Sequence, residues 1–241
     1  MDVLHNFKQY FSFTKREARD LIITSLVLGF IFSFSEWGIE VFDIRAGIYS
    51  WFNAFLVAIL AVLIHVLAQK LVAIHRGYTV QYKLWEIGLV AAILVVFLSN
   101  GMWYVAIPGT ITVALIKRFR LGKRWQGALK KDEAHIAFAG PFANIFLAII
   151  FQGILNAGFV NLLIEKVVLV NTWMAVFSIL PIPFLDGFKI FYHSRTWGLF
   201  SVLFIGSLAV FLTWFSFWQT IITALVLTVL ISIVYFIKFE L

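Results

Sequence analysis

The chain has 241 residues, of which 62% are hydrophobic and 13% are charged. Its 27 phenylalanines and 9 tryptophans exceed what a soluble core of this length needs, so the composition predicts an integral membrane protein in a lipid bilayer and excludes a soluble domain. The net charge of +7 fits cytoplasmic loops and not nucleic-acid binding, because no basic stripe with interleaved aromatic residues is present. The absence of cysteine excludes disulfides and thiolate metal sites.

The first predicted element lies within residues 11–34, "FSFTKREARDLIITSLVLGFIFSF". No small-residue cleavage pattern follows its apolar run, so we interpret it as a retained transmembrane helix and not as a signal peptide. Thr14 followed by Glu17 predicts a capping box at the helix start, in which each side chain binds the backbone N–H of the other residue. A second span is expected over residues 48–74, ending at His75-Arg76-Gly77.

Residues 84–116 are harder to assign, because the apolar run at 84–98 is barely long enough to cross a bilayer. Pro108-Gly109 interrupts the next run, and the alternating sequence "GTITVALI" at 109–116 predicts a short strand. Non-helical backbone at membrane depth is tolerated only against protein or a wet cavity, so we expect a membrane-embedded β element here. Whether residues 84–116 span or re-enter the bilayer is left open at this point.

Further helices are expected at 134–159 and 162–182, and in a block at 198–237 that divides near residues 217–219. The predicted fold class is therefore an all-α polytopic membrane protein, with about six or seven transmembrane helices and one short β element, in a single domain over residues 1–241. The highest density of Lys and Arg lies at 117–131, which predicts a cytoplasmic loop on the same side as the amino terminus. This topology requires residues 84–116 to return to the side that they leave.

Three stretches contain polar residues in apolar surroundings. The first, "LIHVLAQKLVAIH" at 63–75, places His65 and Gln69 one helical turn apart on the same face. A single histidine in an apolar helix is usually a hydrogen-bonded interior residue, so this stretch alone does not predict a site. The second, "AFAGPFANI" at 137–145, contains Gly140, Pro141 and Asn144, and the third, at 171–190, contains Asn171, Pro181, Pro183 and Asp186.

Together these stretches resemble the site-2 protease family of intramembrane zinc metalloproteases, and more closely its archaeal membrane-only members. That family has H-E-x-x-H on one core helix, A-G-P-x-x-N on the next, and an asparagine followed by L-P-x-x-P-L-D-G on the third. The matching positions in this chain are His65, Ala139, Gly140, Pro141, Asn144, Asn171, Pro181, Asp186 and Gly187. The resemblance covers roughly residues 11–195, and its core elements lie near 48–76, 134–159 and 162–190.

The resemblance implies a zinc ion held by two histidines and an aspartate, and a groove for an unwound transmembrane segment at Gly140, Pro141, Asn171, Pro181 and Pro183. The sequence departs from this pattern at the two most demanding positions. Val66 stands where a glutamate would activate water, and Gln69 stands where the second histidine would bind zinc.

We therefore expect no catalytic residue in the chain and a vestigial site formed by His65, Asn144 and Asp186. Only His65 and Asp186 are left to hold a metal, so no cofactor is expected. These two side chains should lie close enough to pair, with Gln69 or Asn144 completing the network.

The preferred interpretation is a catalytically inactive homologue, a pseudoprotease that binds or scaffolds transmembrane segments of other proteins. One alternative is an active zinc metallopeptidase that uses His65, Asp186 and one unrecognised ligand. Another is a structural subunit of a larger membrane complex. All three predict a multi-pass protein of the cell membrane with a cytoplasmic amino terminus.

Overall fold

The computed structural model describes residues 10–38, 42–116, 130–212 and 217–239, and most of them are helical. The first half of the chain forms α2 (Lys15–Ser33), the short 3-10 helix η1 (Phe34–Glu36), α3 (Ile44–His75), β1 (Tyr78–Lys83), α4 (Glu86–Leu98) and β2 (Thr110–Leu115). The second half forms α5 (Lys130–Asn156), α6 (Leu162–Ser178), α7 (Asp186–His193), α8 (Arg195–Phe211) and α9 (Phe217–Phe239).

Within the described residues, three helical segments are long and apolar enough to cross a membrane: α2 together with η1, α3 and α5. Shorter apolar helices are α4, α8 and the part of α9 at residues 222–237. Large apolar side chains are exposed along α3, α4 and α9, among them Phe52, Leu98 and Ile233, as lipid-facing surfaces require. The apolar helices thus indicate a helical protein of a lipid bilayer, whereas the number of crossings stays a prediction.

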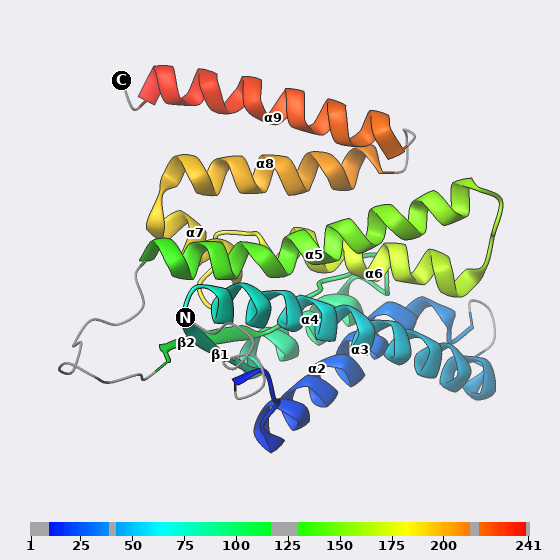
Figure 1. The fold of residues 1–241 in the computed structure, drawn as a ribbon. Helices are drawn as coiled ribbons and strands as arrows, with labels where there is room; N and C mark the ends of the chain where they lie inside the picture. The colour runs from blue at the N-terminus through cyan, green and yellow to red at the C-terminus, as the bar shows by residue number, and fades with distance from the viewer. Residues whose placement is uncertain (1–9, 39–41, 117–129, 213–216, 240–241) are drawn as a thin grey trace.

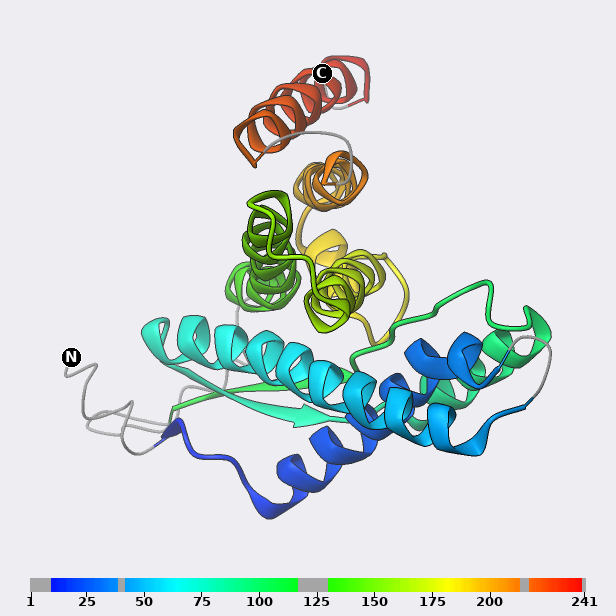
Figure 2. The same cartoon turned by 90° about the vertical axis from the view of Figure 1, so that its right-hand side faces the viewer.

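The helices stack in layers, with α2 and α3 next to each other, α5 and α6 above them, then α8, and α9 outermost (Figures 1 and 2). Helix α3 packs closely on α2, because Gly29 lies against the backbone of Phe55, where a Cβ would come within 2.8 Å of Phe55 Cα. Fully buried alanines, including Ala58 and Ala61, line the inner face of α3. Small residues of this kind let membrane helices approach closely.

The start of α2 has the predicted capping box. The backbone N–H of Thr14 donates to Glu17 Oε2 at 2.8 Å, and the backbone N–H of Glu17 donates to Thr14 Oγ1 at 3.2 Å. The predicted division of the last apolar block is confirmed as well, since α8 ends at Phe211 and α9 begins at Phe217.

The β element has two strands where the sequence predicted one. β2 pairs antiparallel with β1, with Tyr78 opposite Leu115 and Lys83 opposite Thr110. Residues Tyr78, Val80 and Tyr82 of β1 are buried and alternate with more exposed ones, so the strand lays one face against the helices. Its outer edge is covered by α2, where Glu17 Oε1 accepts the backbone N–H of Tyr82 at 3.1 Å.

The strand pair also constrains residues 84–109, since it joins the two ends of this segment. Helix α4 has 13 residues and is therefore about 20 Å long, short of a hydrocarbon core of about 30 Å. The chain leaves β1, forms α4 and returns to β2 beside β1. The two ends of the segment therefore lie side by side, whereas the side of the membrane on which they lie stays a prediction. Most of the basic loop at 117–131 lies outside the described residues, and its cytoplasmic placement stays a prediction.

Candidate functional site

The candidate site begins on the buried face of α3, where His65 and Gln69 lie one helical turn apart. His65 is 2% exposed and Gln69 is fully buried. Val66 is also fully buried, among apolar neighbours of the same core. The position of the missing glutamate is thus filled by an aliphatic side chain that packs against other residues and carries no proton acceptor.

Asp186 reaches this face of α3 from the first position of α7, which follows a bend after α6. The bend exposes Pro181 and Pro183 and holds Phe184 at a φ of 74°, a left-handed conformation that is uncommon outside glycine. Gly187 closes the bend, because any Cβ at this position would overlap the backbone carbonyl of Ile179. The bend therefore fixes the direction in which the carboxylate of Asp186 points.

Three polar side chains meet at one carboxylate oxygen. His65 Nε2 lies 2.8 Å from Asp186 Oδ2, and Gln69 Nε2 donates to the same oxygen at 2.9 Å. Because a carboxylate can only accept, the histidine tautomer with its proton on Nε2 satisfies this contact. The predicted pairing of His65 with Asp186, completed by Gln69, is therefore what the structure contains.

Several polar atoms of the same region lack hydrogen-bond partners among the described residues: His65 Nδ1, Gln69 Oε1 and both amide atoms of Asn144. Asn144 is fully buried on α5, one turn beyond Gly140. Gly140 itself lies against the imidazole, since a Cβ there would come within 2.6 Å of His65 Cδ2 and Cε1. Asn144 thus lies on the helix that packs against His65, but it does not join the hydrogen bonds of His65, Gln69 and Asp186.

Lys189 is a neighbour of the site that sequence reasoning missed. Its amine donates to the carbonyl oxygen of Ile111 on β2 at 2.8 Å and lies 4.0 Å from Asp186 Oδ1. Burial lowers the pKa of the Lys189 amine, because desolvation disfavours the charged form, and the charges of Asp186 and Glu133 oppose that shift. The sequence does place Lys189 three residues after Asp186, and this spacing brings two side chains onto the same face of a helix. That spacing could have predicted Lys189 as a neighbour of the site.

A second buried polar cluster includes Lys70, which directly follows Gln69 on α3. Lys70 Nζ is 2.8 Å from Glu17 Oε1, and the two side chains are only 2% and 3% exposed. Glu17 also accepts the backbone N–H groups of Thr14 and Tyr82, and Lys70 donates to the carbonyl of Ser12 at 3.3 Å. This Glu17–Lys70 cluster joins α2, α3 and β1, and the sequence reasoning found only its capping half.

The residues present do not fit the zinc site that the resemblance implies. The cluster offers one imidazole, one carboxylate and a neutral amide, whereas catalytic zinc sites have three ligands drawn from histidine, carboxylate and thiolate. No group of three His, Asp or Glu side chains gathers elsewhere in the described parts of the chain.

The residues assigned to a substrate groove lie in different environments. Gly140 and Pro141 are buried within α5, and the side-chain amide of Asn171 donates to the carbonyl of Val167 on its own helix at 2.8 Å. Pro181 and Pro183 are exposed in the bend. None of the five lines either of two sizeable cavities, one between α5, α6 and α8 and one beside η1. Their role in binding a transmembrane segment stays a prediction.

A curated protein of Methanocaldococcus jannaschii, described as a "putative zinc metalloprotease", is similar to this chain. It is 27% identical over 221 residues, which cover 85% of this chain and 98% of that protein. No family model and no solved structure matches the chain. The similarity extends over most of both proteins and gives limited support to the family resemblance that the motifs suggest.

Proposed function

We propose that this protein is a catalytically inactive, site-2-protease-like membrane protein that binds transmembrane segments of other proteins without cleaving them. The observation that supports this proposal is the direct hydrogen bonding of His65 and Gln69 to Asp186, with Val66 beside them. A hydrolytic site needs a bound metal and a base that takes a proton from water. Here Val66 and Gln69 stand at the positions that the resemblance assigns to the base and to the second histidine.

The proposal includes a topology. About six or seven helices cross the cell membrane, residues 84–116 re-enter on the side that they leave, and the amino terminus and the 117–131 loop are cytoplasmic. This arrangement follows the distribution of Lys and Arg, and the pairing of β1 with β2 supports the return of residues 84–116.

The test restores the missing ligand and measures bound zinc. Wild-type protein and the Gln69→His variant are purified without added zinc, offered zinc, washed, and analysed for metal content per chain. We expect the wild type to retain far less than one equivalent. Gln69→His should retain close to one, because it would place a second imidazole one turn from His65 and facing Asp186.

Gln81→His is the matched control, because Gln81 is exposed on β1 and adding an imidazole there should not raise the zinc content. The control separates specific ligation from zinc adhering to any new histidine. Near-stoichiometric zinc in the wild type that disappears with His65→Ala would contradict the proposal and favour the metallopeptidase alternative.

A further inference from the structure

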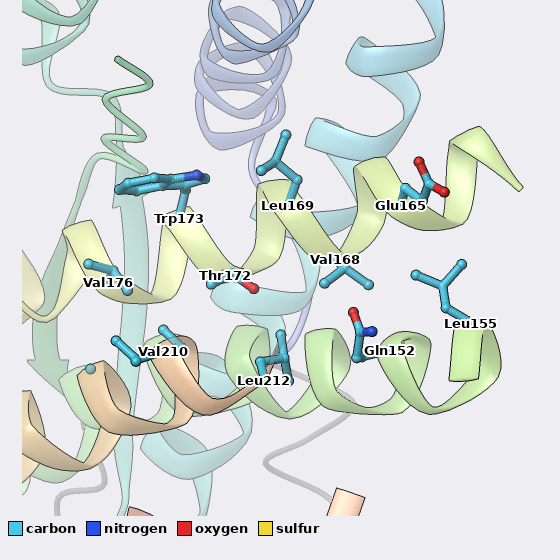
Figure 3. Close-up of a pocket in the computed structure, with 12 residues that line it drawn as sticks. Gln152, Leu155, Glu165, Val168, Leu169, Thr172, Trp173, Val176, Val210 and Leu212 are labelled. Carbon is cyan, nitrogen blue, oxygen red and sulfur yellow. The ribbon is translucent and has the colours of Figure 1, made fainter. Parts of the chain in front are cut away.

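A groove lies between α5, α6 and α8, and none of its lining residues belongs to the His65–Asp186 cluster (Figure 3). Its volume is about 560 Å³. Helix α6 supplies one wall of the groove, and its lining residues follow the helical spacing of three to four residues. They are Glu165, Val168, Leu169, Thr172, Trp173 and Val176. This spacing places them on one face of the helix, which borders the groove over about 17 Å, or roughly three turns.

One end of the groove is polar and acidic. Glu165 and Gln152 lie at the same end, where α5 finishes and α6 begins (Figure 3). Glu165 is exposed and forms neither an ion pair nor a side-chain hydrogen bond with any part of the chain that the structure describes. A carboxylate in the first turn stabilises its helix, but its location at the groove also provides a negative charge for a bound group.

The wall supplied by α8 has two small residues, Gly206 and Ala209, followed by Val210 and, directly after the helix end, Leu212. A Cβ added at Gly206 would meet no atom within 4 Å, so packing within the described chain does not require glycine there. Glycine is less favourable than alanine inside a helix. In membrane proteins, small residues on a helix surface mark places where a second helix can approach closely.

We propose that this groove binds a transmembrane helix of another protein that carries a Lys or Arg opposite Glu165 and a small residue opposite Gly206. In Figure 3, Val210 lies near Val176 and Leu212 lies nearer Thr172, so Gly206, which precedes Val210 by a turn, belongs at the end away from Glu165. Val176 lies about 17 Å along α6 from Glu165, and Gly206 lies about one turn further away. The small residue of the partner should therefore lie about four turns, or roughly 14 residues, from its basic residue.

A lipid acyl chain is the competing occupant, since it would fill an apolar groove of this size. The carboxylate of Glu165 disfavours it, because the phosphate of a lipid headgroup at the same end would place two negative charges together. A basic residue at the end of a membrane helix makes the opposite, favourable pair. The helix thus matches both the charge of the groove and the small residues of its α8 wall.

The probe for this proposal is a synthetic, fluorescently labelled polyleucine helix with one lysine near one end and one glycine about 14 residues away. The full chain, carrying a photo-crosslinking amino acid at Leu169, is reconstituted with the peptide in phosphatidylcholine vesicles. We expect a crosslinked product whose yield falls at least tenfold when the peptide lysine is replaced by glutamine. An equal fall is expected for Glu165→Gln and for Gly206→Leu.

Two matched variants control for charge and bulk. Glu86→Gln removes an exposed carboxylate from α4, outside the groove, and Gly153→Leu fills open space beside α5 at a residue that does not line it. Both should leave the yield unchanged. The thermal unfolding of Gly206→Leu should match the wild type, and Glu165→Gln decides the result if it does not.

Equal crosslinking of the peptide without lysine, no crosslinking of either peptide, or crosslinks only to lipid or to a second copy of the chain would each overturn the proposal. The inference rests on the proposed function only in requiring a membrane partner, and the two can fail separately. Stoichiometric zinc in the wild type would overturn the pseudoprotease proposal without changing the crosslinking result. A failed crosslink would leave the zinc experiment unaffected.

Discussion

Two polar clusters occupy neighbouring positions on the buried part of α3, and they differ in how completely their hydrogen bonds are satisfied. At the Glu17–Lys70 cluster, the carboxylate accepts two backbone N–H groups and the lysine amine. At the His65–Asp186 cluster, one imidazole nitrogen and one amide oxygen lack a partner, and the adjacent Asn144 is unpaired, within the described residues. The two clusters share the same helix and the same burial, so these factors do not explain the difference.

Under the proposed function, the two clusters have different roles. Buried polar groups in a stable fold are nearly always paired, because an unpaired group costs free energy on removal from water. The Glu17–Lys70 cluster obeys this rule and holds β1 to two helices, which is a structural role. The His65–Asp186 cluster departs from it, which is what the proposed vestigial site would show. The following variants test this distinction, from the largest expected effect to the smallest.

Lys70→Met should cause the largest loss of stability. It leaves the carboxylate of Glu17 buried without its cation, and breaking a buried ion pair in this way costs about 3–5 kcal/mol. The free energy of unfolding, measured in mixed micelles by titration with a denaturing detergent, should fall by that amount. Lys83→Met is the control, because Lys83 is exposed on β1 and its replacement should change little. Similar values for the two variants would remove the structural role assigned to the cluster.

Gly140→Ala should cause the next largest loss, because the new Cβ would collide with the buried imidazole of His65. Overpacking of this kind costs about 1–3 kcal/mol and would push His65 away from Asp186. Gly153→Ala on the same helix is the matched control, because its Cβ would enter open space. Alanine is the better helix former, so this variant should gain about 0.5–1 kcal/mol. Equal unfolding free energies for the two variants would show that α5 does not press on His65.

The sequence predicted those parts of the molecule that depend on local patterns or on the family motif. Hydropathy located α3, α5 and α6, and the motif brought His65 and Asp186 together across 121 positions of sequence. β1 was missed although Tyr78, Val80 and Tyr82 alternate with polar residues, since a six-residue strand gives a weak signal beside long apolar runs. The partner of Glu17 could not be predicted, because Lys70 lies 53 residues away and only the tertiary fold pairs them.

The coupling between His65 and Asp186 should be smaller than the loss at Lys70. Because the two side chains share a hydrogen bond, His65→Ala and Asp186→Ala should destabilise the protein by amounts that do not add, with a coupling energy of about 0.5–3 kcal/mol. A double-mutant cycle on the unfolding free energy measures this value. Strict additivity would mean that the contact contributes nothing to stability.

Asn144→Leu should have the smallest effect and the most informative sign. Both amide atoms of Asn144 are buried and lack a partner in the described chain, so leucine, which is similar in size, removes an unsatisfied polar group and breaks no hydrogen bond. We expect stability to stay the same or to rise by about 1 kcal/mol.

Gln69→Leu is the contrast, because Gln69 is equally buried but donates to the carboxylate of Asp186. Losing a hydrogen bond to a charged group costs about 1.5–3 kcal/mol. The free energy of unfolding should therefore fall for Gln69→Leu and should not fall for Asn144→Leu. A loss at Asn144 as large as that at Gln69 would show that Asn144 is held by a partner, such as a buried water molecule, and that this part of the cluster is as structural as the Glu17–Lys70 pair.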